Sequence, residues 1–174
     1  GSEMCIRDSK SLIMLYSMEE GLGDSSELVT MLDDAIAGDP QNIELWFSRA
    51  QIFVSLEDYD EAIASLEKAI ELNPQSYEAQ FFTGYYIIMK ADALNQEANE
   101  KEYTNAGEYE ADQKEILSIY SQAVPYLEVA HEIMPQNPDP VQLLKTLCYR
   151  LRDEPGIQEK YDKYFPLWKA AKGE

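Results

Sequence analysis

Apolar side chains recur every three or four residues along most of this chain, the pattern of helices that bury one face. The clearest example is segment 43–76, where two such runs flank the polar turn Glu57-Asp58-Tyr59-Asp60. This turn can cap the second helix, and Asn73-Pro74 ends it, because a residue before proline avoids the helical conformation. A helix-turn-helix unit is therefore predicted. Its apolar positions are Trp46, Ala50, Phe53, Leu56 and Tyr59, then Ala62, Ile63, Leu66, Ala69 and Ile70.

The unit has a period of 34 residues. Pro40 and Pro74 are 34 residues apart, and so are Ala35 and Ala69. A weaker first repeat is predicted over 9–42, and it departs from the pattern where Leu28 replaces the small residue. A repeated helix-turn-helix of this length resembles the tetratricopeptide repeat family. The resemblance implies an all-α fold, a right-handed α-solenoid, and a concave face that binds partner segments.

The third repeat, 77–137, carries an insertion. Pro135 lies 61 residues after Pro74, which is 27 residues more than one repeat. A loop of that length without secondary structure would be unusual in a compact domain. The extra residues, about 91–117, are instead rich in helix-forming types.

The insertion is predicted to lengthen both helices of the third repeat into one extended hairpin. Its arms are expected over 77–103 and 108–133, and they should project about 20 Å beyond the other turns. Pro125 should kink the second arm. The helix-breaking residues lie between the arms, at Thr104, Asn105 and Gly107.

A closing helix pair is predicted over 138–172. Asp139 is expected as the N-cap of its first helix, and Pro140 as the first helical residue. In the last helix, apolar residues alternate with lysines, as suits a cap on a solenoid, and Pro166 should interrupt that helix. The first helix has its apolar stripe at Leu143, Leu144, Leu147, Cys148 and Leu151. The order of repeat, long hairpin and closing pair resembles the C-terminal end of certain bacterial tetratricopeptide proteins.

The start of the chain lacks the helical pattern of the rest. Residues 1–8 show no helical or strand period and are interpreted as a non-native leader, so Cys5 should carry no functional weight. If the chain is the end of a longer solenoid, the first repeat would expose an apolar face on which another repeat, or another copy, could stack. That face would hold Leu12, Leu15 and Tyr16.

Charge narrows the classes of partner. The 174 residues include 33 acidic and 14 basic ones, a net charge of −19. Nucleic acids and anionic lipid surfaces both need a basic face, so neither is an expected partner. Membrane insertion is not expected either, since the chain has no apolar run of about 20 residues. The predicted partner is a basic or polar protein or peptide.

No catalytic, metal or cofactor site is predicted. The catalytic and phosphate-binding motifs that can be recognised by spacing do not occur. His131 is interpreted as a surface or semi-buried helix residue, because a metal site needs three or four ligands. Cys148 is interpreted as a buried packing thiol. The chain is therefore expected not to be an enzyme and to bind no cofactor.

The resemblance places the partner site on the first helices of the second and third repeats. Of the rings there, Trp46, Phe47, Phe81, Phe82, Tyr85 and Tyr86, the core cannot bury all six. Phe47, Gln51, Phe81 and Tyr85 are the predicted contacts. Family members that clamp a terminal carboxylate use basic residues and asparagines at these positions. Here only Arg49 lies nearby, so no carboxylate clamp is expected.

The inserted hairpin offers a second surface. Tyr103, Tyr109 and Tyr120 stand among acidic residues, and they are either contacts along the hairpin arms or an exposed recognition tip. The main hypothesis is a non-catalytic scaffold that binds a partner on its concave face. The alternative is a structural end piece of a longer solenoid, with the hairpin as an assembly contact. The resemblance points to a bacterial parent, of the cell envelope or the cytoplasm.

Overall fold

The computed structural model describes residues 25–173, and this part of the chain is entirely helical and irregular, as predicted. None of its helices is long and apolar enough to cross a membrane. The predictions for residues 1–24, including the leader, Cys5 and the open face at Leu12, Leu15 and Tyr16, lie outside the described residues. The helices are α2 (Ser25–Gly38), α3 (Ile43–Ser55), α4 (Tyr59–Leu72), α5 (Tyr77–Glu100), α6 (Ala106–Ile133), α7 (Asp139–Arg150) and α8 (Ile157–Lys172).

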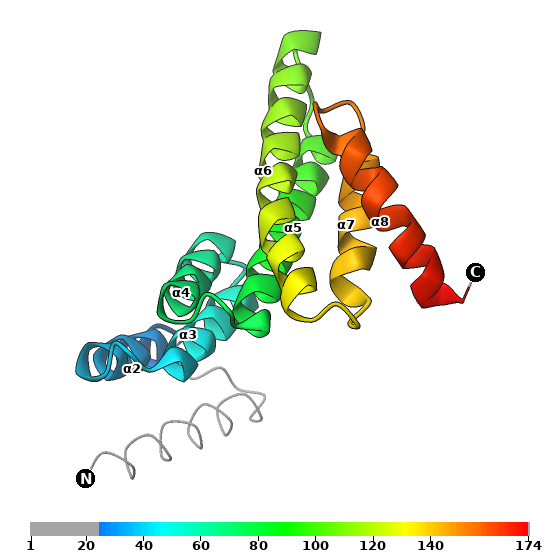
Figure 1. Cartoon of the computed structure of the whole chain (residues 1–174). Coiled ribbons are helices and arrows are strands. Elements are labelled where there is room, and N and C mark those ends of the chain that lie inside the picture. Colours follow the sequence, from blue (N-terminus) through cyan, green and yellow to red (C-terminus); the bar gives the residue numbers. More distant parts are fainter. Residues whose placement is uncertain (1–24, 174) are drawn as a thin grey trace.

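Each helix packs against the next one along the chain, which produces a row of antiparallel hairpins (Figure 1). The long hairpin of α5 and α6 stands at the centre, with α2, α3 and α4 on one side and α7 and α8 on the other (Figure 1). Most packing is therefore between neighbours in sequence, as in other stacked repeats.

Short polar side chains fix where the helices begin. Asp58 caps α4, and its carboxylate accepts a hydrogen bond from the backbone N–H of Glu61 at 3.2 Å. Asn42, Ser76 and Asn105 cap α3, α5 and α6 in the same way. The predicted capping role of the turn before α4 is thus confirmed.

Small residues allow the helices to approach closely, as predicted from the repeat pattern. Ala62, Ala69, Ala123 and Ala130 are completely buried, and Ala50 is 1% exposed. Gly84 shows the tightest approach, because a Cβ atom at this position would lie 2.8 Å from Cγ of Leu127 and 3.2 Å from the backbone oxygen of Ala123. The α5–α6 pair can pack in this way only with a hydrogen at position 84.

The long hairpin is confirmed, with arms at Tyr77–Glu100 and Ala106–Ile133 in place of 77–103 and 108–133. Its inner face is apolar, with Ala91, Ala98 and Ile116 buried between the arms. Tyr120 donates a hydrogen bond to the carboxylate of Asp92 on the other arm. Arg150 of α7 binds the same carboxylate at 2.7 Å, so this polar cluster joins three helices.

Two predictions about the closing pair are wrong. Asp139 is the first residue of α7 and not its N-cap; Pro138 holds the cap position, and the Asn137 side chain accepts from the Asp139 N–H at 3.0 Å. Pro166 does not interrupt the last helix, since α8 continues through it to Lys172. Pro166 is exposed, so water can hydrate the carbonyl that loses its backbone donor. The predicted apolar stripe of α7 is confirmed, with Leu144, Leu147, Cys148 and Leu151 buried.

Candidate partner-binding surfaces

Three rings of α5 form a stack along one side of the helix. The ring centroids of Tyr77 and Phe81 are 5.6 Å apart, and their planes are 10° from parallel. The centroids of Phe81 and Tyr85 are 6.2 Å apart, and their planes are 4° from parallel. Residues four apart lie one above the other on a helix, so this spacing aligns the rings. The Tyr77 hydroxyl accepts a hydrogen bond from the Asn137 side chain at 2.8 Å, which fixes the lower end of the stack.

The stack is open to solvent at its other end. Tyr85 is 38% exposed and Phe82, edge-on to Phe81, is 37% exposed. Tyr86, in contrast, is buried in the core formed with Ala50 and Leu66. We call Tyr77, Phe81, Phe82 and Tyr85 the α5 aromatic face. The prediction that the core cannot bury all the rings is confirmed.

The two predicted contacts on α3 differ from each other. Phe47 is half-buried and packs against the core cluster of Ala50, Ala62, Leu66 and Tyr86. Gln51 is exposed on the next turn of α3. Phe47 is thus partly occupied by core packing, whereas Gln51 is open to solvent.

Arg49 is occupied by its own chain. Its guanidinium binds Asp33 of α2 and Glu61 of α4, each at 2.9 Å, and donates to the Ser65 hydroxyl at 2.7 Å. It also lies over the ring of Phe53, 4.5 Å from the centroid. Arg49 therefore holds three helices together and is not available to grip a carboxylate.

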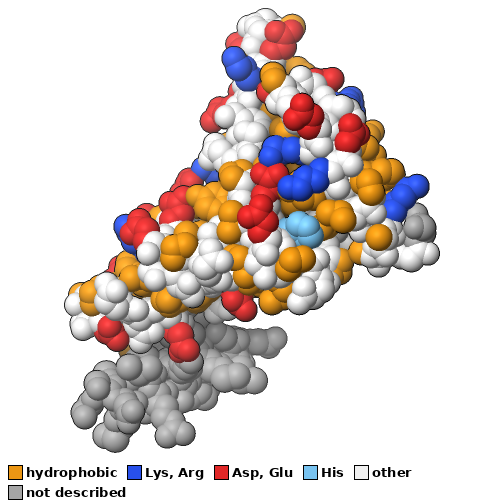
Figure 2. All heavy atoms as spheres, viewed as in Figure 1, with side chains coloured by type: hydrophobic (Ala, Val, Ile, Leu, Met, Phe, Trp, Pro, Cys, Tyr) orange, Lys and Arg blue, Asp and Glu red, His pale blue; other side chains and the backbone are white. Residues whose placement is uncertain are grey.

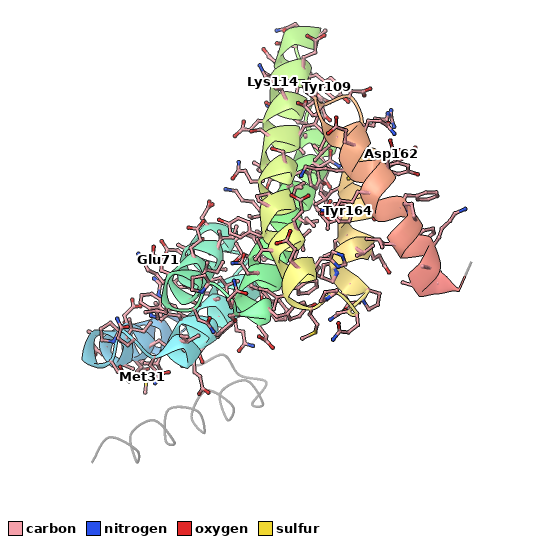
Figure 3. All side chains as sticks on the ribbon, in the orientation of Figure 1. Met31, Glu71, Tyr109, Lys114, Asp162 and Tyr164 are labelled. Carbon is pink, nitrogen blue, oxygen red and sulfur yellow. The ribbon has the colours of Figure 1, made fainter. Side chains whose placement is uncertain are left out.

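The hairpin end forms a separate surface. Tyr103 and Tyr109 meet edge to face, with centroids 5.3 Å apart, and Tyr103 donates to Asp112 at 3.1 Å. Lys101 binds the same carboxylate at 2.6 Å and lowers the pKa of Asp112. Tyr109 remains 47% exposed near the free end of the hairpin (Figure 3). The two open interpretations each hold in part, since Tyr103 is an internal contact and Tyr109 an exposed one.

The hairpin end and the α5 aromatic face lie apart. Tyr85 comes 15 residues before the end of α5 at Glu100, which corresponds to about 22 Å along the axis. The structure therefore brings Phe81 and Tyr85 together, and Tyr103 and Tyr109 together, but places the two groups on different parts of the molecule.

Cys148 and His131, the residues weighed for reactive or metal-binding roles, both pack against other side chains. Burial raises the pKa of the Cys148 thiol, which is 1% exposed. His131 is half-buried and meets the ring of Tyr164 edge-on at 6.0 Å. Among residues 25–173, no group of three or more histidines, cysteines and carboxylates is placed to hold a metal ion.

The sequence analysis did not predict that Tyr77 belongs to the ring stack or that Phe82 is exposed to solvent. The stack could have been found, because Tyr77, Phe81 and Tyr85 have the i, i+4, i+8 spacing of one helix face. The exposure of Phe82 depends on how α5 packs against its neighbours, which spacing alone does not determine.

Comparison with known proteins agrees with this geometry. Residues 43–76, the α3–α4 hairpin, match the family model for the tetratricopeptide repeat. The chain therefore contains a tetratricopeptide repeat. Tetratricopeptide repeat proteins mediate protein–protein interactions.

Three curated proteins match parts of the chain. Human tetratricopeptide repeat protein 28 is 35% identical over 75 residues, which is 41% of this chain and 3% of that protein. Mouse interferon-induced protein with tetratricopeptide repeats 2 is 25% identical over 138 residues, 79% of this chain and 26% of that protein. The rice SGT1 homologue (Oryza sativa subsp. japonica) is 40% identical over 66 residues, 37% and 18% of the respective lengths. The chain thus spans only a small part of the length of these relatives.

Solved structures show the same fold over nearly the whole chain. MamA AMB-1 superposes with a TM-score of 0.58 at 15% identity, covering 95% of this chain and 70% of that one. MamA MSR-1 gives a TM-score of 0.55 at 17% identity, with coverages of 95% and 74%. The likeness in fold therefore extends beyond the matched repeat.

Proposed function

We propose that this protein is a non-catalytic scaffold that captures a partner segment on the surface formed by α3 and the α5 aromatic face. The observation that carries the proposal is the exposure of Phe82 and Tyr85 at the open end of an ordered ring stack. Large aromatic residues exposed together on a soluble protein are typical of a binding site.

Two physical features support this site. The rings of Phe81 and Tyr85 are held by stacking, so a partner does not have to order them on binding. Gln51, exposed on neighbouring α3, offers an amide that can bind a peptide backbone. The net charge of −19 favours a basic or polar partner, which the field of the protein would attract at low salt.

Alanine at both Phe82 and Tyr85 is expected to remove partner capture, by at least about tenfold, because exposed aromatic anchors supply much of an interface's binding energy. The measurement is affinity capture from the native host with the whole chain as bait, quantified by mass spectrometry. The stability of the variant should change little, because both rings already contact solvent.

The matched control is Tyr149→Ala, which removes a tyrosine that is 63% exposed on α7. This variant should retain every protein that the unchanged chain retains. Equal capture by the Phe82/Tyr85 double variant and the unchanged chain would show that the proposal is wrong. Phe47→Ala is a poorer test, since Phe47 contributes to the core.

A second candidate function is structural, with the chain as the end piece of a longer solenoid and the hairpin as its assembly contact. The 47% exposure of Tyr109 at the projecting hairpin end favours it. Under this proposal Tyr109→Ala should weaken assembly with a neighbouring subunit by about tenfold, as for an aromatic anchor. Sedimentation velocity of the native assembly measures this effect, again with Tyr149→Ala as control. Unchanged assembly in Tyr109→Ala contradicts it.

A further inference from the structure

The long hairpin creates a cleft where it stands beside α4. The cleft has a volume of about 330 Å³ and is lined by residues of α4, α5 and α6. Its floor is apolar, with Ile63 of α4, Ile87 of α5 and Ile119 of α6. The charged residues of its rim are Asp60, Glu67 and Lys90. Its remaining lining residues are Gln122, Pro125 and Tyr126 of α6, and we call the whole the junction cleft. It is large enough for a long side chain and part of the backbone that carries it.

The junction cleft and the α5 aromatic face lie on different sides of α5. Lys90 follows Tyr85 by five residues, which places the two side chains about 140° apart around the helix axis. A segment bound on the aromatic face would therefore leave the cleft free. The cleft is a separate surface and not an extension of the proposed site.

The rim of the cleft has an excess of hydrogen-bond acceptors. The Glu67 carboxylate accepts a hydrogen bond from the Tyr126 hydroxyl at 2.9 Å, and no ion pair found within residues 25–173 involves Glu67. Lys90 is already paired with Asp60 at 2.5 Å. Among the described residues the Glu67 carboxylate thus forms no ion pair, which favours a cationic ligand group.

Gln122 adds a further acceptor to the wall of the cleft. Gln122 and Pro125 of α6 both line the cleft, and both are exposed. The side-chain amide oxygen of Gln122 can accept a hydrogen bond from an incoming backbone N–H or guanidinium group.

We propose that the junction cleft binds a short basic segment of a partner protein, with an aliphatic side chain on the three isoleucines and a neighbouring arginine or lysine on Glu67. Apolar complementarity and the unpaired carboxylate each match one half of such a segment. The inference goes beyond the proposed function, because it assigns a second site with its own ligand chemistry.

Methyl NMR tests the proposal with the whole chain labelled at the isoleucine δ1 carbons. The probe is a short synthetic peptide of alternating leucine and arginine, and its counterpart of alternating leucine and glutamate is the charge control. The leucine–arginine peptide should shift the methyl signals of Ile63, Ile87 and Ile119 in a saturable way. The leucine–glutamate peptide should leave them in place.

Variants of α4 separate a specific site from general attraction to an acidic protein. Glu67→Lys should weaken binding of the leucine–arginine peptide by about tenfold or more, because it places a cation where the ligand's cation would bind. Glu67→Gln keeps an acceptor for Tyr126 and should weaken binding severalfold. The matched control is Glu71→Lys, one turn further along α4. Glu71 pairs with Lys68 and does not line the cleft.

Three results would overturn the proposal. The first is an equal loss of binding in Glu67→Lys and Glu71→Lys, since this indicates attraction by net charge alone. The second is a set of shifts that excludes the cleft isoleucines. The third is equal binding of the two peptides. The Phe82/Tyr85 double variant should bind the probe normally. Failure of the proposed site on α3 and the α5 aromatic face can therefore be distinguished from failure of the junction-cleft proposal.

Discussion

Replacing Gly84 with alanine is expected to lower the free energy of unfolding by about 1–3 kcal/mol, the usual cost of overpacking a core. The added methyl group would lie 2.8 Å from Cγ and 3.0 Å from Cδ2 of Leu127, a side chain with no exposure. It would also lie 3.2 Å from the Ala123 carbonyl, which is backbone and cannot rotate away. Both arms of the long hairpin would have to separate. Urea denaturation followed by circular dichroism measures the change.

The same contact predicts a coupling between two substitutions. Leu127→Ala alone should cost about 2–5 kcal/mol through the cavity that it leaves. In that background Gly84→Ala should cost much less, because the clash with Leu127 is gone. Gly38→Ala serves as the control, since a Cβ atom there meets nothing within 4 Å. Additive costs in the double variant would show that the α5–α6 contact does not limit residue 84.

Above about pH 10 the protein is expected to lose stability steeply, because three tyrosines are held in their neutral form. Burial raises the pKa of Tyr126 to about 12, and the hydrogen bond to Glu67 adds to this shift. Burial also raises the pKa values of Tyr120 and Tyr164, which donate to Asp92 and Glu128 respectively. Negative carboxylates beside a phenol further disfavour the phenolate.

Stability falls with rising pH because these tyrosines have a higher pKa in the folded chain than in the unfolded chain. In the unfolded chain a tyrosine loses its proton near pH 10, whereas in the folded chain these three keep theirs to higher pH. The stability that they contribute is therefore complete below pH 10 and is lost as the pH rises through the folded pKa. Each contributes a slope of up to about 1.4 kcal/mol per pH unit, and less for Tyr126, which solvent reaches.

Tyr164→Phe provides the test. Near pH 8 this variant should be less stable than the unchanged chain by about 0.5–1.5 kcal/mol, because the hydrogen bond to Glu128 at 2.9 Å is lost. Above pH 10 the difference should shrink and then reverse, since phenylalanine has no proton to lose. The measurement is a series of urea unfolding curves from pH 8 to pH 11. Parallel stability curves for the two proteins would contradict the prediction.

Figure 2 shows where the charge lies on one face of the molecule. Acidic side chains are spread from the lower repeats to the hairpin end, while a cluster of basic ones lies beside His131. Lys160 belongs to the closing helices and binds Glu128 of the hairpin at 2.7 Å. Arg150 of α7 likewise binds Asp92 of the hairpin at 2.7 Å, so basic groups of the closing helices pair with carboxylates of the hairpin.

Much of the fold followed from residues near each other in sequence. The α3–α4 hairpin was predictable because Asp58 caps one helix, Asn73-Pro74 ends it, and small residues recur at 34-residue spacing. The hairpin arms were predictable because Thr104, Asn105 and Gly107 are the only cluster of breakers in a helix-forming stretch. Signals of this kind act within one or two turns, so no tertiary information is needed.

The candidate sites were less accessible from sequence. Phe82 and Tyr86 lie one turn apart on the same side of α5, yet one is open and the other buried, because α5 touches different neighbours along its length. The junction cleft combines Ile63, Ile87 and Ile119 from three helices, and no local pattern links them. Pro166 was misjudged for a similar reason, since its cost depends on whether solvent reaches the unpaired carbonyl.

The geometry of the α5–α6 hairpin has a consequence for how such a protein can vary. The hairpin leaves the row of repeats at Tyr77 and returns to it at Ile133, and lengthening both arms equally moves neither point. Insertions or deletions matched across the two arms are therefore neutral for the stacking of α4 and α7. Seven residues per arm, about two helical turns, would preserve the face that each arm presents. The reach of the tip can thus change over evolution independently of the repeats, which continue to determine how the chain stacks.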